Sequence, residues 1–538
     1  MALLFCALLA SCVRSGAGSG RYGANPWTIH GVLRIAGRQQ PDSLNPLLGT
    51  QTVDRDLSMF WAAYLFVWND RDEFVPELAT RVPTQRNGDI SPDGLRIRYH
   101  LRHGVVWQDG APFTADDVVY TWHQMLNPRN FIVSRFGYDL IRTIAQPDHY
   151  TVDVHLKRRF SPFVATFFTM SNQTDCILPK HLLDRYPDIN RAAYNGLPIG
   201  TGPFRMVSYE RGSRITFVAN PRYWRGTPRL RRIEWHLVES DDTMLTMLQT
   251  HAIDVYYRAA ETLFPSLQHI PGTRVVLSPF TRFADLGFNG ATPALADVRV
   301  RRALAYATDR AALIDKVTHG VAVRGDSDQP PFSWAFDPSV RKYPYDPGEA
   351  AALLDAAGWR RSADGMRRKN GRALALELVS FTGSATASEA EVLLQDEWHR
   401  AGIEVTIKNY SSAQLYATLG NGGIEQSGKF DVIFENWANG TDPDDTILFR
   451  CDMEPPAGWN VYHFCNARLD AAAAAALKTY DQSSRKQQYG IVQRIVASDL
   501  PILVLWYQRQ LDVINTDFQN YKPAHAVTPF WNTWEWSI

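Results

Sequence analysis

The sequence has no excess of charge of either sign, few cysteines and, beyond its first residues, no long apolar stretch. In 538 residues, 56 Lys and Arg balance 56 Asp and Glu. Proteins that bind nucleic acid normally carry a basic face, so this balance argues against nucleic acid as a partner. No later segment offers about 18 consecutive uncharged apolar residues, which predicts that the mature body is soluble.

Common catalytic signatures are also absent. We find no GxSxG, HExxH or CxxC pattern and no Gly-rich dinucleotide fingerprint after a predicted strand. Such patterns would place a nucleophile, a zinc ion, a redox pair or a cofactor phosphate. We therefore expect no catalytic residue, cofactor or metal. A secreted hydrolase with Glu435 and Asp442 as acid and base remains the enzymatic alternative.

The first residues differ from the rest of the chain. Residues 1–9 are almost wholly apolar and lead into Ala10-Ser11-Cys12. A short apolar run that ends in small residues is typical of a secretory signal and is too short to span a bilayer. Small residues directly before a cysteine resemble the bacterial lipobox, which implies a signal at 1–11 and a lipid anchor on Cys12. The Gly- and Ser-rich segment 12–27 then predicts a flexible tether. A buried apolar N-terminus is the alternative.

The body of the chain alternates helical and strand patterns. A helix is predicted over 114–125, with Thr114 as its cap, and a hairpin over 204–219. Asp297 opens a helix that Gly320 closes, because its apolar residues keep helical spacing. Further helices are predicted after Asp346 and around 390–401. Predicted helices that are joined to strands by short loops indicate an α/β protein with mixed sheets.

Six segments occur in an order that resembles the peptide-binding proteins of ABC importers, the oligopeptide, dipeptide and nickel class of solute-binding proteins. The most specific is WQDGAPFTADDV. The six are DSLNPLL (42–48), WQDGAPFTADDV (107–118), GTGPF (200–204), NPRYW (220–224), FN with VRRALAYATDR (288–289 and 300–310) and YDPGEAAALLDAAGW (345–359). The resemblance implies a two-lobed periplasmic-binding-protein-like fold of type II, with hinge strands between the lobes.

The resemblance also implies domain boundaries and partners. The expected ligand is a peptide or peptide-like solute, delivered by a monomeric, membrane-anchored protein to the permease outside the cytoplasm. A solute sensor on the same scaffold is the alternative to transport. The expected divisions are lobe I over 28–65, 195–280 and 495–538, a subdomain inserted in lobe I over 66–194, and lobe II over 281–494.

The segment 430–445 is the expected ligand segment, a buried strand that enters a polar loop at Trp437. In the family an aspartate three residues after this tryptophan pairs with the ligand's α-ammonium. Here that position is Gly440, preceded by Asn439, and the nearest acid is Asp442. An amide accepts a hydrogen bond but cannot neutralise an ammonium. Either Asp442 substitutes as the counter-charge, or the ligand is neutral or anionic.

Two further features bear on the site. Residues 500–508 read as a buried strand that crosses between the lobes, and its Trp506 is a candidate ligand contact or a core residue. Cys451 and Cys465 lie close in sequence outside the cytoplasm, which favours a disulfide. A zinc site that includes His463 is the rival. The remaining Cys176 is expected to be a small buried apolar residue.

Overall fold

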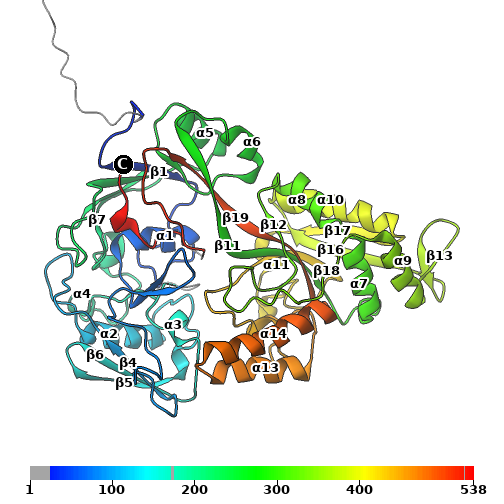
Figure 1. The fold of residues 1–538 in the computed structure, drawn as a ribbon, viewed down its shortest axis with the longest axis horizontal. Helices are drawn as coiled ribbons and strands as arrows, with labels where there is room; N and C mark the ends of the chain where they lie inside the picture. Colours follow the sequence, from blue (N-terminus) through cyan, green and yellow to red (C-terminus); the bar gives the residue numbers. More distant parts are fainter. Residues whose placement is uncertain (1–24, 171–174, 526–527) are drawn as a thin grey trace, which may run out of the picture.

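The computed structural model describes residues 25–170, 175–525 and 528–538. Cys12, the expected signal and most of the expected tether therefore lie outside the described residues. An eleven-stranded mixed sheet runs through both halves of the molecule (Figure 1). In spatial order its main path is β17 (Glu404–Tyr410), β16 (Ala375–Phe381), β18 (Val432–Ala438), β11 (Thr273–Phe288), β19 (Ile502–Asn515), β10 (Val255–Tyr256), β1 (Val32–Gly37), β9 (Arg232–Leu237), β8 (Arg214–Ala219) and β7 (Phe204–Glu210).

Two long antiparallel strands, β11 and β19, join the halves. In one half they pair with each other over Thr273–Pro279 and β19 pairs with β10. In the other half β11 pairs with β18, and the short β12 (Val323–Arg324) pairs with β19. A strand of 14 residues spans roughly 45 Å, enough to reach across two packed lobes. The fold is the expected two-lobed α/β arrangement.

Helices cover both faces of the sheet in the second half. One face packs against α7 (Val298–Ala307), α8 (Arg310–Thr318), α9 (Pro347–Ala356) and α10 (Ala385–Arg400). The opposite face packs against α12 (Thr446–Phe449), α13 (Ala467–Lys478) and α14 (Gln482–Asp499). Residues that alternate along a strand face opposite sides, so neighbours in β18 enter different cores: Ile433 lies in one and Phe434 in the other.

The first half contains a second, smaller sheet. Its order is β4 (Arg96–His100), β6 (Thr151–Leu156) and β5 (Ile141–Asp148), and α2 (Ala115–Leu126) lies against it. A hairpin of β2 (Phe66–Trp68) and β3 (Phe74–Pro76) precedes it. One hydrophobic core joins this region to β1, β7, β8, β9 and α1 (Thr52–Trp61), while α5 (Asp241–Gln249) and α6 (Phe264–Leu267) pack with β10 in a separate cluster.

Several local predictions are confirmed. Thr114 caps α2 and accepts a hydrogen bond from the backbone N–H of Asp116, while Asp117 completes a capping box. The hairpin of β7 and β8 closes at the pair Glu210 and Arg214. Asp346 caps α9 and Pro347 takes its first position. These features depend on neighbouring residues, so the sequence specifies them locally.

The single helix predicted from Asp297 to Gly320 is wrong: the structure has two, α7 and α8. Thr308 ends the first, where its hydroxyl accepts a hydrogen bond from Trp398 Nε1 at 3.0 Å. Asp309 caps the second helix: its side chain accepts hydrogen bonds from the backbone N–H groups of Ala311 and Ala312. The apolar spacing continues across the break because both helices pack on the same face of the sheet.

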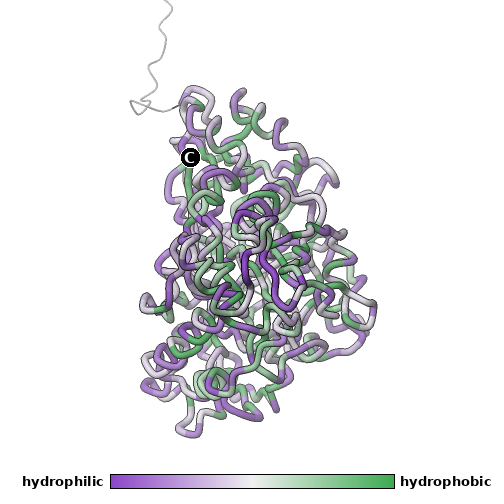
Figure 2. Tube along the Cα trace, turned by 90° about the vertical axis from the view of Figure 1, so that its right-hand side faces the viewer, coloured by the Kyte–Doolittle hydropathy of each residue, from purple (hydrophilic) through white to green (hydrophobic). Residues whose placement is uncertain are grey.

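The described part of the chain contains no helix that is both long and apolar enough to cross a membrane. Hydrophobic segments are threaded through the molecule, and hydrophilic ones are common at its periphery (Figure 2). A three-stranded patch at the tip of the second half is strongly basic. It consists of β13 (Arg360–Arg361), β14 (Arg367–Lys369) and β15 (Arg372–Ala373).

Candidate functional site

A small cavity lies where the two halves meet. It has a volume of about 20 Å³, room for about one water molecule. Its walls come from segments that are far apart in the sequence. They are Trp68 of β2, Thr281 of β11, the segment Gln329–Trp334 after β12, the loop Asn439–Pro443 after β18, and His525 near the C-terminus. We call this the interlobe pocket.

Asn439 and Gly440, two of the predicted ligand residues, line this pocket. The Asn439 backbone N–H donates to the Thr281 carbonyl at 3.1 Å, and its Nδ2 donates to the Asp328 carbonyl at 2.6 Å. The Asn439 Oδ1 and the Thr281 Oγ1 are buried and find no hydrogen-bond partner among the described residues. Buried polar atoms are nearly always bonded, so these two mark positions where a bound molecule would bond.

Asp442 is near the pocket but is already engaged. Its two carboxylate oxygens accept bonds from the Arg485 guanidinium of α14 at 2.7 and 2.8 Å. The Asp442 and Arg485 side chains are only 14% and 8% exposed. Arg485 also lies over the ring of Trp334, in the pocket wall. Asp442 therefore anchors the ligand loop to α14.

The two predicted tryptophans do not line the pocket. Trp437 is half-buried, with its ring centroid 6.4 Å from that of Trp459. Trp506 is 1% exposed and packs on Phe434, 5.9 Å between centroids, within the core of the second half. Trp506 was expected to be either a ligand contact or a core residue, and this position is that of a core residue.

The residues that sequence reasoning missed are Thr281, Gln329, Trp334, Trp68 and His525. They come from four segments that meet only through the sheet order and the path of the loops. No local pattern marks them, because each segment reads as an ordinary strand or loop. The one available signal was the position of Trp68 and Trp334 beside short turns.

The acid–base pair of the hydrolase alternative is not assembled. The Glu435 carboxylate accepts a hydrogen bond from the Tyr462 hydroxyl at 2.9 Å and does not line the interlobe pocket. Asp442 is held by Arg485. A general acid and a general base must both reach one substrate, and this arrangement separates them.

Glu435 belongs to a buried acidic cluster with Asp285 and Glu425. Asp285 and Glu435 are cross-strand neighbours in β11 and β18, and all three side chains are buried. Both carboxylate oxygens of Asp285 lack a hydrogen-bond partner among the described residues. Burial, together with repulsion from Glu435, raises the pKa of Glu425 to about 9. The cluster therefore retains protons near neutral pH.

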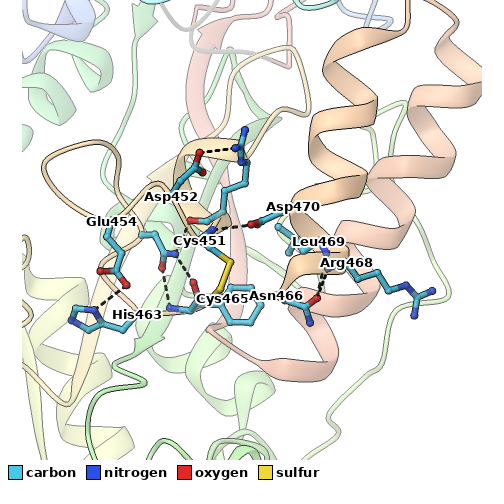
Figure 3. Close-up of a disulfide and its surroundings, with 12 residues drawn as sticks. Cys451, Asp452, Glu454, His463, Cys465, Asn466, Arg468, Leu469 and Asp470 are labelled. Carbon is cyan, nitrogen blue, oxygen red and sulfur yellow. Dashed lines mark hydrogen bonds and ion pairs between the residues drawn. A yellow bond between two sulfur atoms is a disulfide. The ribbon is translucent and has the colours of Figure 1, made fainter.

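Cys451 and Cys465 form a disulfide in the structure (Figure 3). His463, the zinc ligand of the rival interpretation, points away from the sulfurs toward Glu454, with 3.3 Å between its Nδ1 and the carboxylate. The structure's described residues contain no group of three or more ligands arranged to hold a metal ion. Cys176 is a buried free thiol, as expected.

Comparison with known proteins identifies the family. The model of bacterial extracellular solute-binding proteins, family 5 (middle region), matches residues 73–454. The chain belongs to this family. The family resemblance seen in the sequence is thereby confirmed, and the chain is a solute-binding protein from a family of extracellular transport proteins rather than of enzymes.

Individual family members resemble the chain over most of its length. The oligopeptide-binding protein AppA of Bacillus subtilis is 24% identical over 512 residues, 94% of this chain and 91% of AppA. The dipeptide-binding protein of Escherichia coli is 25% identical over 89% of this chain and 90% of its own length. The structure of NikZ from Campylobacter jejuni with Ni(L-His) superimposes with a TM-score of 0.76 at 24% identity, covering 95% of this chain and all of NikZ.

Proposed function

We propose that this protein is the extracytoplasmic binding component of an ABC importer and that it captures a peptide or peptide-like solute. The observation that carries the proposal is the interlobe pocket. Residues from both halves line it, and the buried Asn439 Oδ1 and Thr281 Oγ1 have no hydrogen-bond partner among the described residues. The names of the related AppA and E. coli proteins, which bind oligopeptides and dipeptides, support the choice of solute.

Capture would proceed by closure of the two lobes. The pocket, at about 20 Å³, is too small for a peptide, so the walls must separate for a solute to enter. Because β11 and β19 run continuously through both halves, bending at their crossing would open the pocket without breaking either core. The closed, loaded form would then be recognised by the permease.

The remaining elements of the proposal concern location and assembly. We place the lobe boundaries as the sequence predicts them: 28–65, 195–280 and 495–538 for lobe I, with 66–194 inserted, and 281–494 for lobe II. The acylated Cys12 would hold the protein, as a monomer, at the outer face of the cell membrane. No catalytic step is required of any residue.

Native mass spectrometry of the protein purified from its host tests the proposal. We expect a bound species whose mass and fragmentation identify a peptide or a close analogue. Calorimetric titration with that compound should be saturable, and the compound should be recovered unaltered. Recovery of a cleaved product would support the hydrolase instead, and retention of a sugar or lipid alone would overturn the peptide assignment.

A further inference from the structure

The two crossing strands are irregular where they pass between the lobes. The pairing of β11 with β19 is interrupted between Pro279 and Phe283, so Phe280, Thr281 and Arg282 have no partner on β19. Such bulges turn side chains in new directions and are frequent beside binding sites. Thr281 faces the interlobe pocket. Arg282 is the next residue along the strand and is paired with Ala438 of β18.

Arg282 carries a charge with no counter-charge. Its Nε is buried without a hydrogen-bond partner, and the described residues provide no hydrogen bond or ion pair to its guanidinium. The guanidinium carbon lies 5.7 Å from the centroid of the Phe280 ring, a cation–π contact that neutralises nothing. A half-buried arginine normally has a carboxylate or carbonyl partner, because an unpaired cation away from water is costly.

The neighbouring charged groups increase this cost. Arg258, two residues after the end of β10, also lies 5.7 Å from the Phe280 centroid. Two nearby acids already contact Arg258: Asp56 lies 3.4 Å from its guanidinium, and Asp512 accepts its backbone N–H at 2.9 Å. Burial, with repulsion from Arg258 and Arg55, holds the pKa of Arg282 below its usual value. The remaining titratable neighbour is the phenol of Tyr416, from lobe II, which is neutral because its pKa is raised above the ordinary 10.

Arg282 thus sits on the crossing strand, with Arg258 and Arg55 of lobe I and Tyr416 of lobe II as its titratable neighbours. A group that binds there would touch both lobes and favour closure. The missing element is an anion, and the flat fork of a guanidinium matches a carboxylate, which accepts two parallel hydrogen bonds.

We propose that Arg282 is a ligand-binding residue that receives a carboxylate of the solute at the lobe crossing. This inference rests on the proposed function and makes it more specific. Recognition would then depend on an acidic group of the ligand, consistent with Gly440 standing where related proteins are expected to hold an aspartate for the ammonium. A peptide would be bound through its C-terminal carboxylate or an acidic side chain.

The first test compares ligands. An equimolar library of synthetic tripeptides without Asp or Glu is offered in free-acid and in C-terminally amidated form, and retained peptides are detected by native mass spectrometry. We expect the protein to retain free acids and to bind the amides at least roughly thirtyfold more weakly. Losing one partner of a buried charge pair costs about 2 kcal/mol or more, and about 1.4 kcal/mol is a factor of ten. Equal retention of both forms would overturn the inference and leave the peptide function standing.

The second test changes the protein. Arg282→Met keeps the apolar stem beside Phe280 and removes the charge, and Arg282→Lys keeps the charge without the fork. We expect Met to abolish the preference for free acids and Lys to reduce it. Arg274→Gln is the matched control, because Arg274 is an exposed arginine of the same strand. It should bind as the parent does. Loss of binding in this control equal to that in the Met variant would contradict a specific role for Arg282.

A third measurement needs no peptide. Without ligand, Arg282→Met removes an uncompensated cation and should raise the melting temperature, whereas loss of a merely structural arginine would lower it. Acetate should raise the melting temperature of the parent protein more than that of the Met variant. The reference for both proteins is acetamide with sodium chloride added to the same ionic strength. A lower melting temperature in Arg282→Met together with no acetate effect would refute the inference. If no tripeptide of either form binds while the acetate effect is present, the peptide function fails and the carboxylate site stands.

Discussion

Asp442 and Arg485 bind each other through two parallel hydrogen bonds, from Arg485 Nη2 to Oδ1 at 2.7 Å and from Nη1 to Oδ2 at 2.8 Å. The pair joins the ligand loop after β18 to α14, and the Tyr489 hydroxyl accepts a further bond from the same guanidinium at 2.9 Å. Burial lowers the pKa of Arg485, but the adjacent Asp442 carboxylate raises it by more, so the net shift is upward. The acid nearest to the missing ammonium partner therefore already has a cation of its own.

We expect Asp442→Asn to weaken folding more than ligand discrimination. Removing one partner of a buried ion pair typically costs about 3–5 kcal/mol, because the other charge stays buried. Chemical denaturation should show a loss of that order in the free energy of unfolding. Calorimetry should show equal changes in affinity for a peptide and its N-acetylated form. A loss confined to the free amine would instead make Asp442 the ligand's counter-charge.

The disulfide should be measurable by thiol labelling. When the protein is denatured without reductant, Cys451 and Cys465 should remain unlabelled while Cys176, a free thiol, reacts and serves as the internal control. Their separation of 14 residues predicts, in the chain-entropy model, roughly 3 kcal/mol of stabilisation. The double variant Cys451→Ser, Cys465→Ser should lose about that amount. Labelling of both cysteines before reduction would contradict the bond.

The lipid anchor is tested by Cys12→Ser. A single acylated cysteine with its lipids provides apolar area for membrane attachment, so the parent protein should partition into detergent. The serine variant should move to the soluble fraction with unchanged ligand binding. Cys176→Ser is a suitable control, because that thiol is buried in the folded protein. Unaltered membrane attachment of the Cys12 variant would show that the anchor is elsewhere.

The sequence predicted features that neighbouring residues determine and missed those that depend on tertiary contacts. The capping of α2 by Thr114 needs only the next three residues, and it was predicted correctly. The break between α7 and α8 escaped prediction because Trp398, 90 residues away, bonds to Thr308. The pocket could be predicted only in part. Asn439 and Gly440 came from the family resemblance, whereas Thr281 and Trp334 enter through the path of the chain.

Arg282 illustrates the same limit for charge. A single arginine within a strand pattern carries no sequence signal, because surface strands contain many arginines. Its role depends on Arg258 and Asp56, which come from other parts of the chain: Asp56 pairs with Arg258, and no acid among the described residues pairs with Arg282. Only the three-dimensional arrangement distinguishes this residue from the exposed Arg274 of the same strand.

The buried acidic cluster should make stability fall as pH rises. The Glu425 carboxyl has an ordinary pKa of 4.5 and is raised to about 9 by burial and by repulsion from Glu435. Between these values the folded protein holds a proton that the unfolded chain has released. The stabilisation from this proton is complete below pH 4.5 and is lost progressively as pH approaches 9. Asp285, Glu435, Tyr416 and Tyr462 are the titratable groups around it.

Glu425→Gln removes the proton equilibrium and keeps the shape of the side chain. We expect the variant to melt at about the same temperature as the parent near pH 5 and at a higher temperature near pH 8, because the parent there must either keep its proton or bury a charge. Differential scanning calorimetry of both proteins across this range measures the divergence. Glu389→Gln, at an exposed position on α10, is the control and should leave the pH profile unchanged. Parallel profiles for parent and Glu425→Gln would mean that the proton resides on Asp285 or Glu435, and Asp285→Asn should then reproduce the divergence.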